Sequence, residues 1–310
     1  MVSRILIGPS SFAELDKMPL MRLKMAGYET VLNPYRRKLK KEELLDILDT
    51  DIVGIIAGLE SLDREVLKKG NIKVISRVGA GLSNVDLEAA CEFGVKVFNT
   101  PDATTNAVAE LAIGAMLSLL RMIPQMSQAL HLRQWKKQIG VQLEGKTVVI
   151  IGFGRIGRRV AHLLDPFGVR ILVVDPFLDE NDLIAYQKTT LPEALPVADI
   201  VTIHSSGEDC LLGEEEFLLM KKGAYLLNVA RGNLISESAL IKSLEKGTLA
   251  GAWLDTFAEE PYEGPLCDWD NVILTPHVGS YTADCRSRME NEAVDNLLNY
   301  LEKVRSENEN

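Results

Sequence analysis

One stretch near the middle of the chain constrains its fold more than any other. An apolar run, Thr147 to Ile151, leads directly into the glycine pattern G-x-G-x-x-G at Gly152, Gly154 and Gly157. A helical pattern follows the third glycine, and a second apolar run ends on Asp175. Strand, glycines, helix and acid in this order are typical of a β-α-β unit that binds a dinucleotide. The pattern therefore predicts a parallel α/β sheet built around this unit.

Each glycine of the pattern has a physical role in holding a pyrophosphate. Gly152 permits a sharp turn, Gly154 lets backbone N–H groups approach the phosphates, and Gly157 lets the helix lie close to the strand. Arg155 and Ile156 begin the helix, whose N-terminus favours negative charge. The alternative is a glycine-rich turn that joins a strand to a helix and holds no ligand.

Asp175 determines which dinucleotide is expected. Its carboxylate, at the end of the second strand, is placed to accept both ribose hydroxyls and would repel the 2′-phosphate of NADP. The next residues, Pro176 and Phe177, supply no cation to neutralise such a phosphate. The predicted cofactor is therefore NAD.

Composition narrows the class of protein. The chain has 310 residues, of which 46% are hydrophobic, enough for two globular domains. Its formal net charge of −10 gives no general attraction for nucleic acid or anionic membranes, so neither is an expected partner. The four cysteines have no zinc spacing, so no metal site is predicted and free thiols in the cytoplasm are expected. We expect no signal peptide and no apolar segment long enough to cross a bilayer.

Two sets of strands are expected. Short β-branched runs at residues 5–7, 30–32, 52–56, 74–78 and 95–98 alternate with polar helical stretches and predict a small parallel α/β domain. The second set comprises six strands, at residues 147–151, 170–175, 200–204, 224–229, 250–255 and 272–275. The predicted fold is α/β, with two doubly wound parallel sheets, one flavodoxin-like and one Rossmann, linked by long helices.

Helical patterns suggest how the domains divide. A long apolar helix from Thr104 to Arg121 is expected to bridge them, and an amphipathic helix from Ala283 to about Leu301 precedes a charged, frayed tail. We therefore expect a discontinuous substrate domain, 1–100 plus 281–310, around an NAD domain of 101–280. The bridging helix and the segment near Trp135 are predicted to bury a homodimer interface, because tryptophan is favoured in interfaces.

Three residues that follow the ends of predicted strands are candidates for catalysis: Arg231, Glu260 and His277. The carboxyl ends of parallel strands share one edge, so these side chains can converge on a nicotinamide ring. Oxidation of a 2-hydroxy acid needs a base for the hydroxyl proton, and histidine titrates near working pH. A neighbouring carboxylate orients the imidazole, and the arginine fork suits a substrate carboxylate. Each residue taken alone is more often a surface group than a catalytic one.

A second glycine turn closes the fourth strand of the first domain. Ala80 and Gly81 follow this strand, and their backbone N–H groups would lie at the crevice where open α/β sheets bind ligands. With Arg77 nearby, the turn is predicted to bind the substrate carboxylate. The alternative is a turn that serves only packing.

Segments along nearly the whole chain together resemble a known family. They are 77–86, 99–101, 109–111, 152–157, 228–232, 254–257 with 260–261, and 275–279. The combination is similar to the D-isomer-specific 2-hydroxyacid dehydrogenases, closest to the phosphoglycerate dehydrogenase branch. The resemblance implies a central NAD domain and a dimer. It also implies that His277 is the acid/base, Glu260 its partner and Arg231 the substrate anchor, and that cofactor contacts include Ala230, Asp255, His277 and Gly279.

Two departures leave the substrate open. The family usually has His-x-Pro where this chain has His204-Ser205-Ser206, and phosphoglycerate dehydrogenases often carry an arginine where this chain has Ala57-Gly58. One reading is an NAD-dependent dehydrogenase of D-3-phosphoglycerate, in serine biosynthesis. Another is a reductase of an unphosphorylated 2-keto acid such as glyoxylate or hydroxypyruvate. A third, from a different class, is an NADH-sensing corepressor like the C-terminal-binding proteins, against which the absence of a long tail argues.

Overall fold

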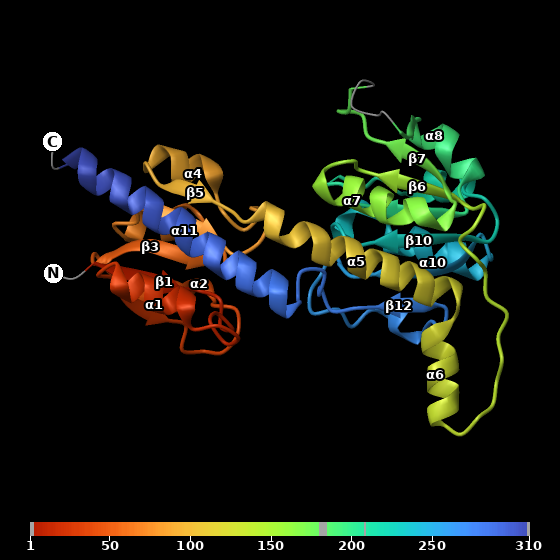
Figure 1. Cartoon of the computed structure of the whole chain (residues 1–310), viewed down its shortest axis with the longest axis horizontal. Coiled ribbons are helices and arrows are strands. Elements are labelled where there is room, and N and C mark those ends of the chain that lie inside the picture. The colour runs from red at the N-terminus through yellow and green to blue at the C-terminus, as the bar shows by residue number, and fades with distance from the viewer. Residues whose placement is uncertain (1–2, 180–184, 208, 309–310) are drawn as a thin grey trace. The chain divides into compact units, whose positions relative to one another are not determined.

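The chain divides into two compact units. The computed structural model describes residues 3–179, 185–207 and 209–308 (Figure 1). Unit 1 is Met1–Thr104 with Ser280–Asn310, and unit 2 is Thr105–Gly279. Helix α5 (Pro101–Leu120) crosses the first boundary, whereas the chain returns to unit 1 through a turn at Gly279 and Ser280. The predicted long helices are therefore found at both boundaries, because α11 (Ala283–Asn308) begins directly after the second.

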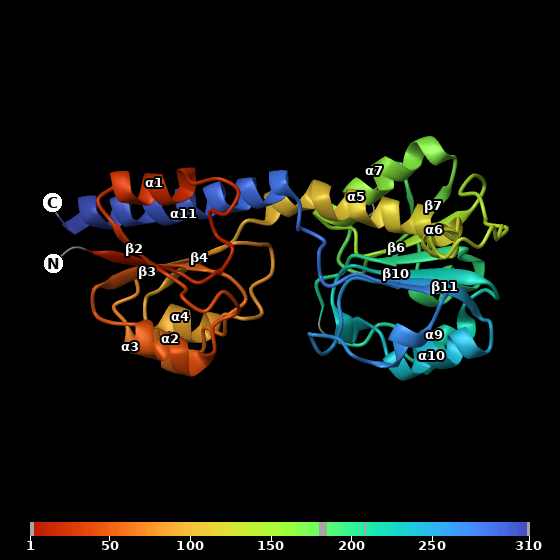
Figure 2. The ribbon, with the colours of Figure 1, turned by 90° about the horizontal axis from the view of Figure 1, so that it is seen from below.

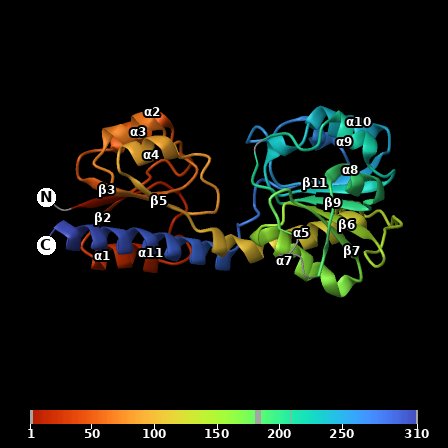
Figure 3. The same ribbon diagram turned by 90° about the horizontal axis from the view of Figure 1, so that it is seen from above.

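Unit 1 contains a five-stranded parallel sheet in the order β2-β1-β3-β4-β5. Its strands are β1 Arg4–Ile7, β2 Glu29–Leu32, β3 Ile52–Ala57, β4 Val74–Arg77 and β5 Lys96–Phe98. Figures 2 and 3 show α1 (Met18–Met25) and α11 (Ala283–Asn308) on one face of this sheet, and α2 (Lys41–Ile47), α3 (Arg64–Lys69) and α4 (Leu87–Glu92) on the other. Helices on both faces explain why the strands are apolar without alternation. The predicted flavodoxin-like order is confirmed.

The C-terminal helix is longer than predicted. The sequence pattern suggests fraying after about Leu301, yet α11 continues to Asn308. Lys303 and Glu307 lie one turn apart, with 3.9 Å between ammonium and carboxylate, and the Ser306 hydroxyl donates to the Lys303 carbonyl at 2.8 Å. Such one-turn contacts stabilise a helix end that has no apolar stripe.

Unit 2 contains a seven-stranded parallel sheet in the order β12-β11-β10-β9-β6-β7-β8. Its strands are β6 Thr147–Ile151, β7 Arg170–Val174, β8 Gln187–Lys188, β9 Ile200–Ile203, β10 Ala224–Asn228, β11 Leu249–Leu254 and β12 Val272–Leu274. The six strands expected from the sequence are present. The seventh, β8, was not predicted, because a two-residue edge strand without apolar side chains has no sequence pattern. The direction of winding reverses between β6 and β9, where doubly wound sheets bind ligands.

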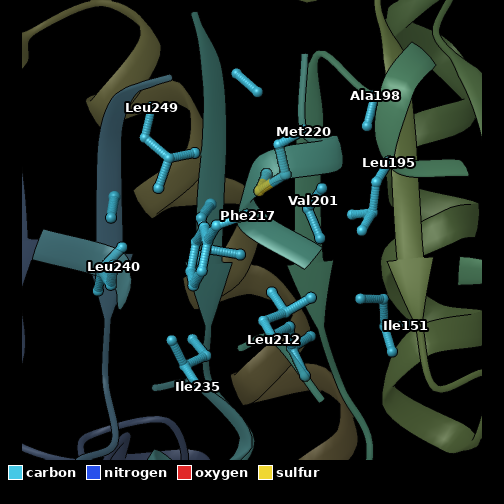
Figure 4. Packing of buried hydrophobic residues seen from close by; sticks show 14 of the residues in the cluster. Ile151, Leu195, Ala198, Val201, Leu212, Phe217, Met220, Ile235, Leu240 and Leu249 are labelled. Carbon is cyan, nitrogen blue, oxygen red and sulfur yellow. The ribbon is translucent and has the colours of Figure 1, made fainter. Parts of the chain in front are cut away.

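Two apolar layers enclose the unit 2 sheet. Helices α5 and α7 (Arg155–Leu164) cover one face, and α8 (Leu191–Ala194), α9 (Glu214–Leu219) and α10 (Glu237–Glu245) cover the other. Figure 4 shows the second layer, in which Phe217 of α9 lies between Leu240 of α10 and Val201 of β9. These layers fix the positions of the strand ends that carry the candidate site.

Helix α5 corrects one expectation. It is long and apolar enough to cross a membrane by length and composition, contrary to the expectation that no such segment exists. In the structure 56% of the most apolar 18-residue stretch of this helix is buried. The buried core helix of a globular domain passes the same test of length and composition, so this helix is weak evidence for a membrane span.

The helix that follows α5 was not predicted from the sequence. Helix α6 (Ile123–His131) follows α5 and contains no buried residue. Figure 1 shows it extending away from the sheet of unit 2, before a segment without regular structure that includes Trp135. Ile123, Met126 and Leu130 recur along it at helical spacing, so the sequence contains a signal for this helix that the prediction overlooked.

Candidate active site

The glycine loop between β6 and α7 has the geometry that the sequence suggests. Gly152 has φ +87°, and a Cβ there would lie 2.6 Å from the Ser205 backbone nitrogen. A Cβ on Gly157 would lie 2.1 Å from the Gly152 carbonyl oxygen. Gly154 differs, because a Cβ there meets no atom within 4 Å. The first and third glycines are therefore required by packing, whereas the second faces open space.

The residues around that open space suit a pyrophosphate. Gly154 is the N-cap of α7, and Arg155 is its first residue. Ile156 and Gly157 lie in the first turn, where backbone N–H groups have no acceptor within the helix. These donors, together with the helix dipole, favour a phosphate at this end of the helix.

Asp175 is tied to the same loop. Its Oδ2 accepts a hydrogen bond from the Phe153 N–H at 2.8 Å, and its Oδ1 accepts one from the Phe177 N–H at 3.0 Å. The carboxylate therefore holds the turn of the glycine loop next to the end of β7. Each carboxylate oxygen has a second lone pair, which leaves capacity for ribose hydroxyls.

His277 and Glu260 form a pair at the ends of β12 and β11. The His277 Nδ1 lies 2.9 Å from one carboxylate oxygen of Glu260 and 3.1 Å from the other. The Phe257 N–H donates to Glu260 Oε1 at 3.1 Å, which orients the carboxylate. Both side chains remain partly exposed. This contact leaves His277 Nε2 as the ring atom available for proton transfer to a substrate.

Arg231 lies on the loop after β10, and a glycine joins this loop to that of Glu260. A Cβ on Gly232 would lie 1.9 Å from the Phe257 carbonyl carbon, so only glycine permits the approach. The Asn228 side chain donates to the Arg231 carbonyl at 2.8 Å and accepts from the Ala230 N–H at 3.0 Å. Sequence reasoning gave Asn228 no role, although its place at the end of a buried strand is a signal.

Asp255 holds the loop that carries His277. The residue is fully buried, with 0% exposure. Its Oδ1 accepts from the Val278 N–H at 2.9 Å and from the Thr275 hydroxyl at 2.5 Å, and its Oδ2 accepts from the Gly279 N–H at 2.8 Å. The Thr275 hydroxyl in turn accepts from the Trp253 indole N–H at 3.0 Å. Sequence reasoning assigned no role to Thr275 or Trp253.

His204 lies where the chain departs from the family pattern. Its Nε2 is 2.9 Å from the Thr202 hydroxyl, and its Nδ1 is buried without a partner among the described residues. Burial lowers the pKa of His204 to about 3. The backbone of His204 and Ser205 fills the space over Gly152, so this loop is part of the glycine turn's packing.

The predicted substrate turn belongs to unit 1. The Gly79 N–H donates to the Thr100 hydroxyl at 2.8 Å, and the Asn99 side chain donates to the Ala80 carbonyl at 2.6 Å. In the part of the chain that the structure describes, the N–H groups of Ala80 and Gly81 donate to no protein group. These two N–H groups are therefore available to an anion.

In unit 1, two charged side chains occupy space that is open only because the neighbouring residue is a glycine without a Cβ. The Arg77 guanidinium lies where a Cβ on Gly79 would be, and the Glu60 carboxylate lies where a Cβ on Gly8 would be. Glu60 is 1% exposed and accepts from the Gly58 N–H at 2.9 Å. Burial raises the pKa of its carboxyl, against the opposing effect of this hydrogen bond. A buried acid directly after β3 was not singled out from the sequence.

The predicted site residues thus fall into two groups. The structure brings His277 and Glu260 into contact and places the Arg231 loop against the Glu260 loop, all in unit 2 with the glycine loop and Asp175. Arg77, Ala80 and Gly81 lie in unit 1. Among residues 3–179, 185–207 and 209–308, no group of three or more His, Cys, Asp or Glu side chains is placed to hold a metal ion.

Comparison with known proteins gives one matching family. The model described as "D-isomer specific 2-hydroxyacid dehydrogenase, NAD binding domain" matches residues 113–279. These residues contain the glycine loop, Asp175 and the three candidate catalytic side chains.

Individual relatives are similar over most of this chain. The D-3-phosphoglycerate dehydrogenase of Methanocaldococcus jannaschii is 38% identical over 281 residues, which cover 87% of this chain and 53% of that protein. The hydroxypyruvate reductase of Thermotoga maritima is 35% identical over 273 residues, which cover 85% of this chain and 89% of that protein. A crystal structure of a glyoxylate reductase from Paecilomyes thermophila has a TM-score of 0.85 at 28% identity and covers 96% of this chain and 94% of that one. This chain spans about half the length of the phosphoglycerate dehydrogenases that it matches.

Proposed function

The chain belongs to the D-isomer-specific 2-hydroxyacid dehydrogenases, and from this premise we propose that it is an NAD-dependent oxidoreductase acting on a D-2-hydroxy acid or its 2-keto acid. Unit 2 contains the NAD-binding domain of the family. We propose that unit 1 binds the substrate.

The observation that carries the proposal is the contact between His277 and Glu260 at the edge of the sheet that also carries the glycine loop. Bound NAD(H) would accept or supply the hydride. In oxidation, neutral His277 takes the hydroxyl proton of the substrate, and in reduction its protonated form returns a proton to the carbonyl oxygen. Glu260 stabilises the charged imidazole while that proton is held.

Arg231 is proposed to anchor the substrate carboxylate. One of its guanidinium N–H groups donates to the Ala230 carbonyl at 2.7 Å, which directs the side chain. The guanidinium has further N–H groups in a planar fork, a geometry that matches a carboxylate. We propose that Arg77, Ala80 and Gly81 supply further substrate contacts from unit 1.

Two substrate classes remain candidates. The relatives include D-3-phosphoglycerate dehydrogenases and a hydroxypyruvate reductase. An unphosphorylated 2-keto acid is favoured by one observation, because β3 is followed by Gly58 and the buried acid Glu60 and by no arginine. A phosphate is normally held by arginine.

A substrate panel tests the proposal. We expect hydride transfer with NAD and D-glycerate, D-lactate or 3-phosphoglycerate, and with NADH and glyoxylate or hydroxypyruvate. The ratio of kcat/KM for 3-phosphoglycerate to that for D-glycerate decides between the two classes. NADH binding without turnover of any acid in the panel would contradict the dehydrogenase and favour the corepressor-like alternative.

We further propose a cytoplasmic homodimer. Four cysteines are unpaired, three of them exposed, as in a reducing compartment. Beyond α5 the chain presents large apolar side chains to solvent: Ile123, Leu130, Leu132, Trp135 and Ile139, with exposed fractions from 49% to 98%. Several large exposed apolar side chains in one short segment favour an interaction site there.

A further inference from the structure

We propose that Thr275 is a positioning residue for the catalytic His277 and that buried Trp253 sets the direction of its hydroxyl proton. The role assigned to His277 rests on the proposed function. The series of hydrogen bonds from Trp253 through Thr275 to Asp255 does not depend on the proposed function, and a separate measurement tests it.

The chemistry of the three groups determines which one donates in each of these hydrogen bonds. An indole N–H is only a donor, so the Thr275 hydroxyl must accept the bond from Trp253 at 3.0 Å. The hydroxyl has one proton, and its other close partner is Asp255 Oδ1 at 2.5 Å. Thr275 therefore donates to Asp255. Trp253 is 0% exposed and packed in the core beneath α5, so its ring cannot turn away.

Asp255 connects Thr275 to the loop that carries His277. Besides Thr275, it accepts from the N–H groups of Val278 and Gly279, so three donors of residues 275–279 surround one buried carboxylate. Between them His277 has φ +52°, in the left-handed region that non-glycine residues rarely adopt. Such a conformation persists only where the surroundings over-determine it.

Loss of the hydroxyl would release part of this constraint. The Trp253 N–H would lose its acceptor, and Asp255 would hold the loop by two bonds from its C-terminal side alone. His277 would then be free to leave the position in which it lies 2.9 Å from Glu260. A misplacement of about 1 Å can reduce a chemical step on the order of a hundredfold.

Kinetics of four variants test the positioning role. We expect Thr275→Val to lower kcat about tenfold to a hundredfold with little change in NADH affinity, and Thr275→Ser to restore most of it. Trp253→Phe should lower kcat by less, because the hydroxyl stays but loses the donor that directs it. Thr256→Val is the matched control, since Thr256 is 3% exposed and its hydroxyl has no partner among the described residues.

The indole N–H resonance of Trp253, assigned by its loss in Trp253→Phe, gives a readout that needs no activity. We expect a shifted, slowly exchanging signal in the wild type, retained in Thr275→Ser and Thr256→Val. In Thr275→Val the signal should move upfield and exchange faster. An indole signal that is unchanged in Thr275→Val overturns the hydrogen-bonded chain, even if the protein is inactive on every acid tested.

The kinetic outcomes are equally decisive. Equal kcat in Thr275→Val and Thr256→Val overturns the positioning role, even if the indole signal moves. If Thr275→Val does not fold, Trp253→Phe decides the same question against Thr256→Val. If the wild type has no dehydrogenase activity, the proposed function is refuted. The indole measurement then still tests the hydrogen bonds from Trp253 through Thr275 to Asp255.

Discussion

His277 lies in a backbone conformation that its own side chain does not favour, and buried Asp255 accounts for it. The carboxylate has 0% exposure and takes its three donors from residues 275–279. The partner of the imidazole, Glu260, is itself oriented by the Phe257 N–H. At the residue scale, the positions of His277 and Glu260, the pair that we propose for proton transfer, therefore depend on hydrogen bonds from neighbouring groups.

The first prediction concerns this pair. We expect His277→Ala to reduce the chemical step on the order of a hundredfold or more, while NADH binding stays close to that of the wild type. Single-turnover kinetics and a fluorescence titration with NADH measure the two quantities. A parallel loss of NADH affinity would indicate that His277 acts mainly in cofactor binding.

Glu260→Gln gives the second prediction, because an amide keeps the shape and removes the charge. The amide cannot offset the positive charge of the imidazole while it holds the substrate proton, so kcat should fall about tenfold or more, while NADH affinity stays close to that of the wild type. Steady-state kinetics and a fluorescence titration with NADH measure the two quantities. A kcat equal to that of the wild type would mean that Glu260 is only structural.

Cofactor choice gives the third prediction. Asp175→Asn keeps an oxygen that can accept from the Phe153 N–H but removes the charge that opposes a 2′-phosphate. We expect the ratio of kcat/KM with NADPH to that with NADH to rise by at least about tenfold, because like charges in contact cost several kcal/mol. Asp175→Ala should relax the preference too but also weaken both cofactors, since the glycine loop loses its acceptor. Comparable use of NADH and NADPH by the wild type would contradict the assignment.

The fourth prediction uses the buried histidine. Burial lowers the pKa of His204 to about 3, whereas the unfolded chain has an ordinary value of about 6.5. Between these pH values the unfolded state binds a proton that the folded state does not, so the free energy of unfolding falls as pH falls from about 6.5 towards 3. His204→Gln removes this contribution. Denaturant unfolding at several pH values should give a smaller acid loss in the variant than in the wild type, and equal losses would contradict the burial argument.

At the scale of elements, the site is built where strand ends and loops approach through glycines. Gly152 and Gly157 let the turn after β6 lie against the loop after β9 and against α7, and Gly232 lets the loop after β10 meet the loop after β11. Gly154 has no such packing role. The same glycine pattern thus contains positions that serve the fold and one that faces open space, and the two kinds should respond differently to a methyl group.

A pair of alanine variants makes the fifth prediction. Gly152→Ala forces a side chain into φ +87° and within 2.6 Å of the Ser205 nitrogen, so it should lower the melting temperature. Gly154→Ala should leave the melting temperature of the protein without cofactor close to the wild-type value and weaken NADH binding. Thermal melts with and without NADH measure both effects. Equal destabilisation of the protein by the two variants would mean that Gly154 also has a packing role.

At the scale of the whole molecule, the chain is two doubly wound units, and the apolar surface of the segment that follows α5 belongs to neither core. Helix α6 has no buried residue, Trp135 is 80% exposed and Ile139 is 98% exposed. This surface supports the proposed homodimer. Sedimentation at micromolar concentration should give the mass of a dimer, and a monomer at that concentration would refute it.

The sequence alone determined the two sheets, the glycine loop and the contact between Glu260 and His277, the pair that we propose for proton transfer. These features depend on local patterns: apolar runs of strand length, glycines where the backbone turns sharply, and polar residues directly after strands. Because parallel strands end at a common edge, the order of segments was enough to predict that Glu260 and His277 meet, and they lie 2.9 Å apart.

Only the tertiary structure decided which groups hold that pair. The contacts of Thr275 with Trp253 and Asp255 join side chains 22 and 20 residues apart in the sequence, on or directly after the neighbouring strands β11 and β12. The burial of Glu60 and of the His204 ring nitrogen Nδ1, and the approach of Gly232 to Phe257, likewise depend on how distant segments pack. Local sequence patterns do not predict such contacts, because burial and hydrogen-bond direction are determined only when separate elements pack together and exclude water.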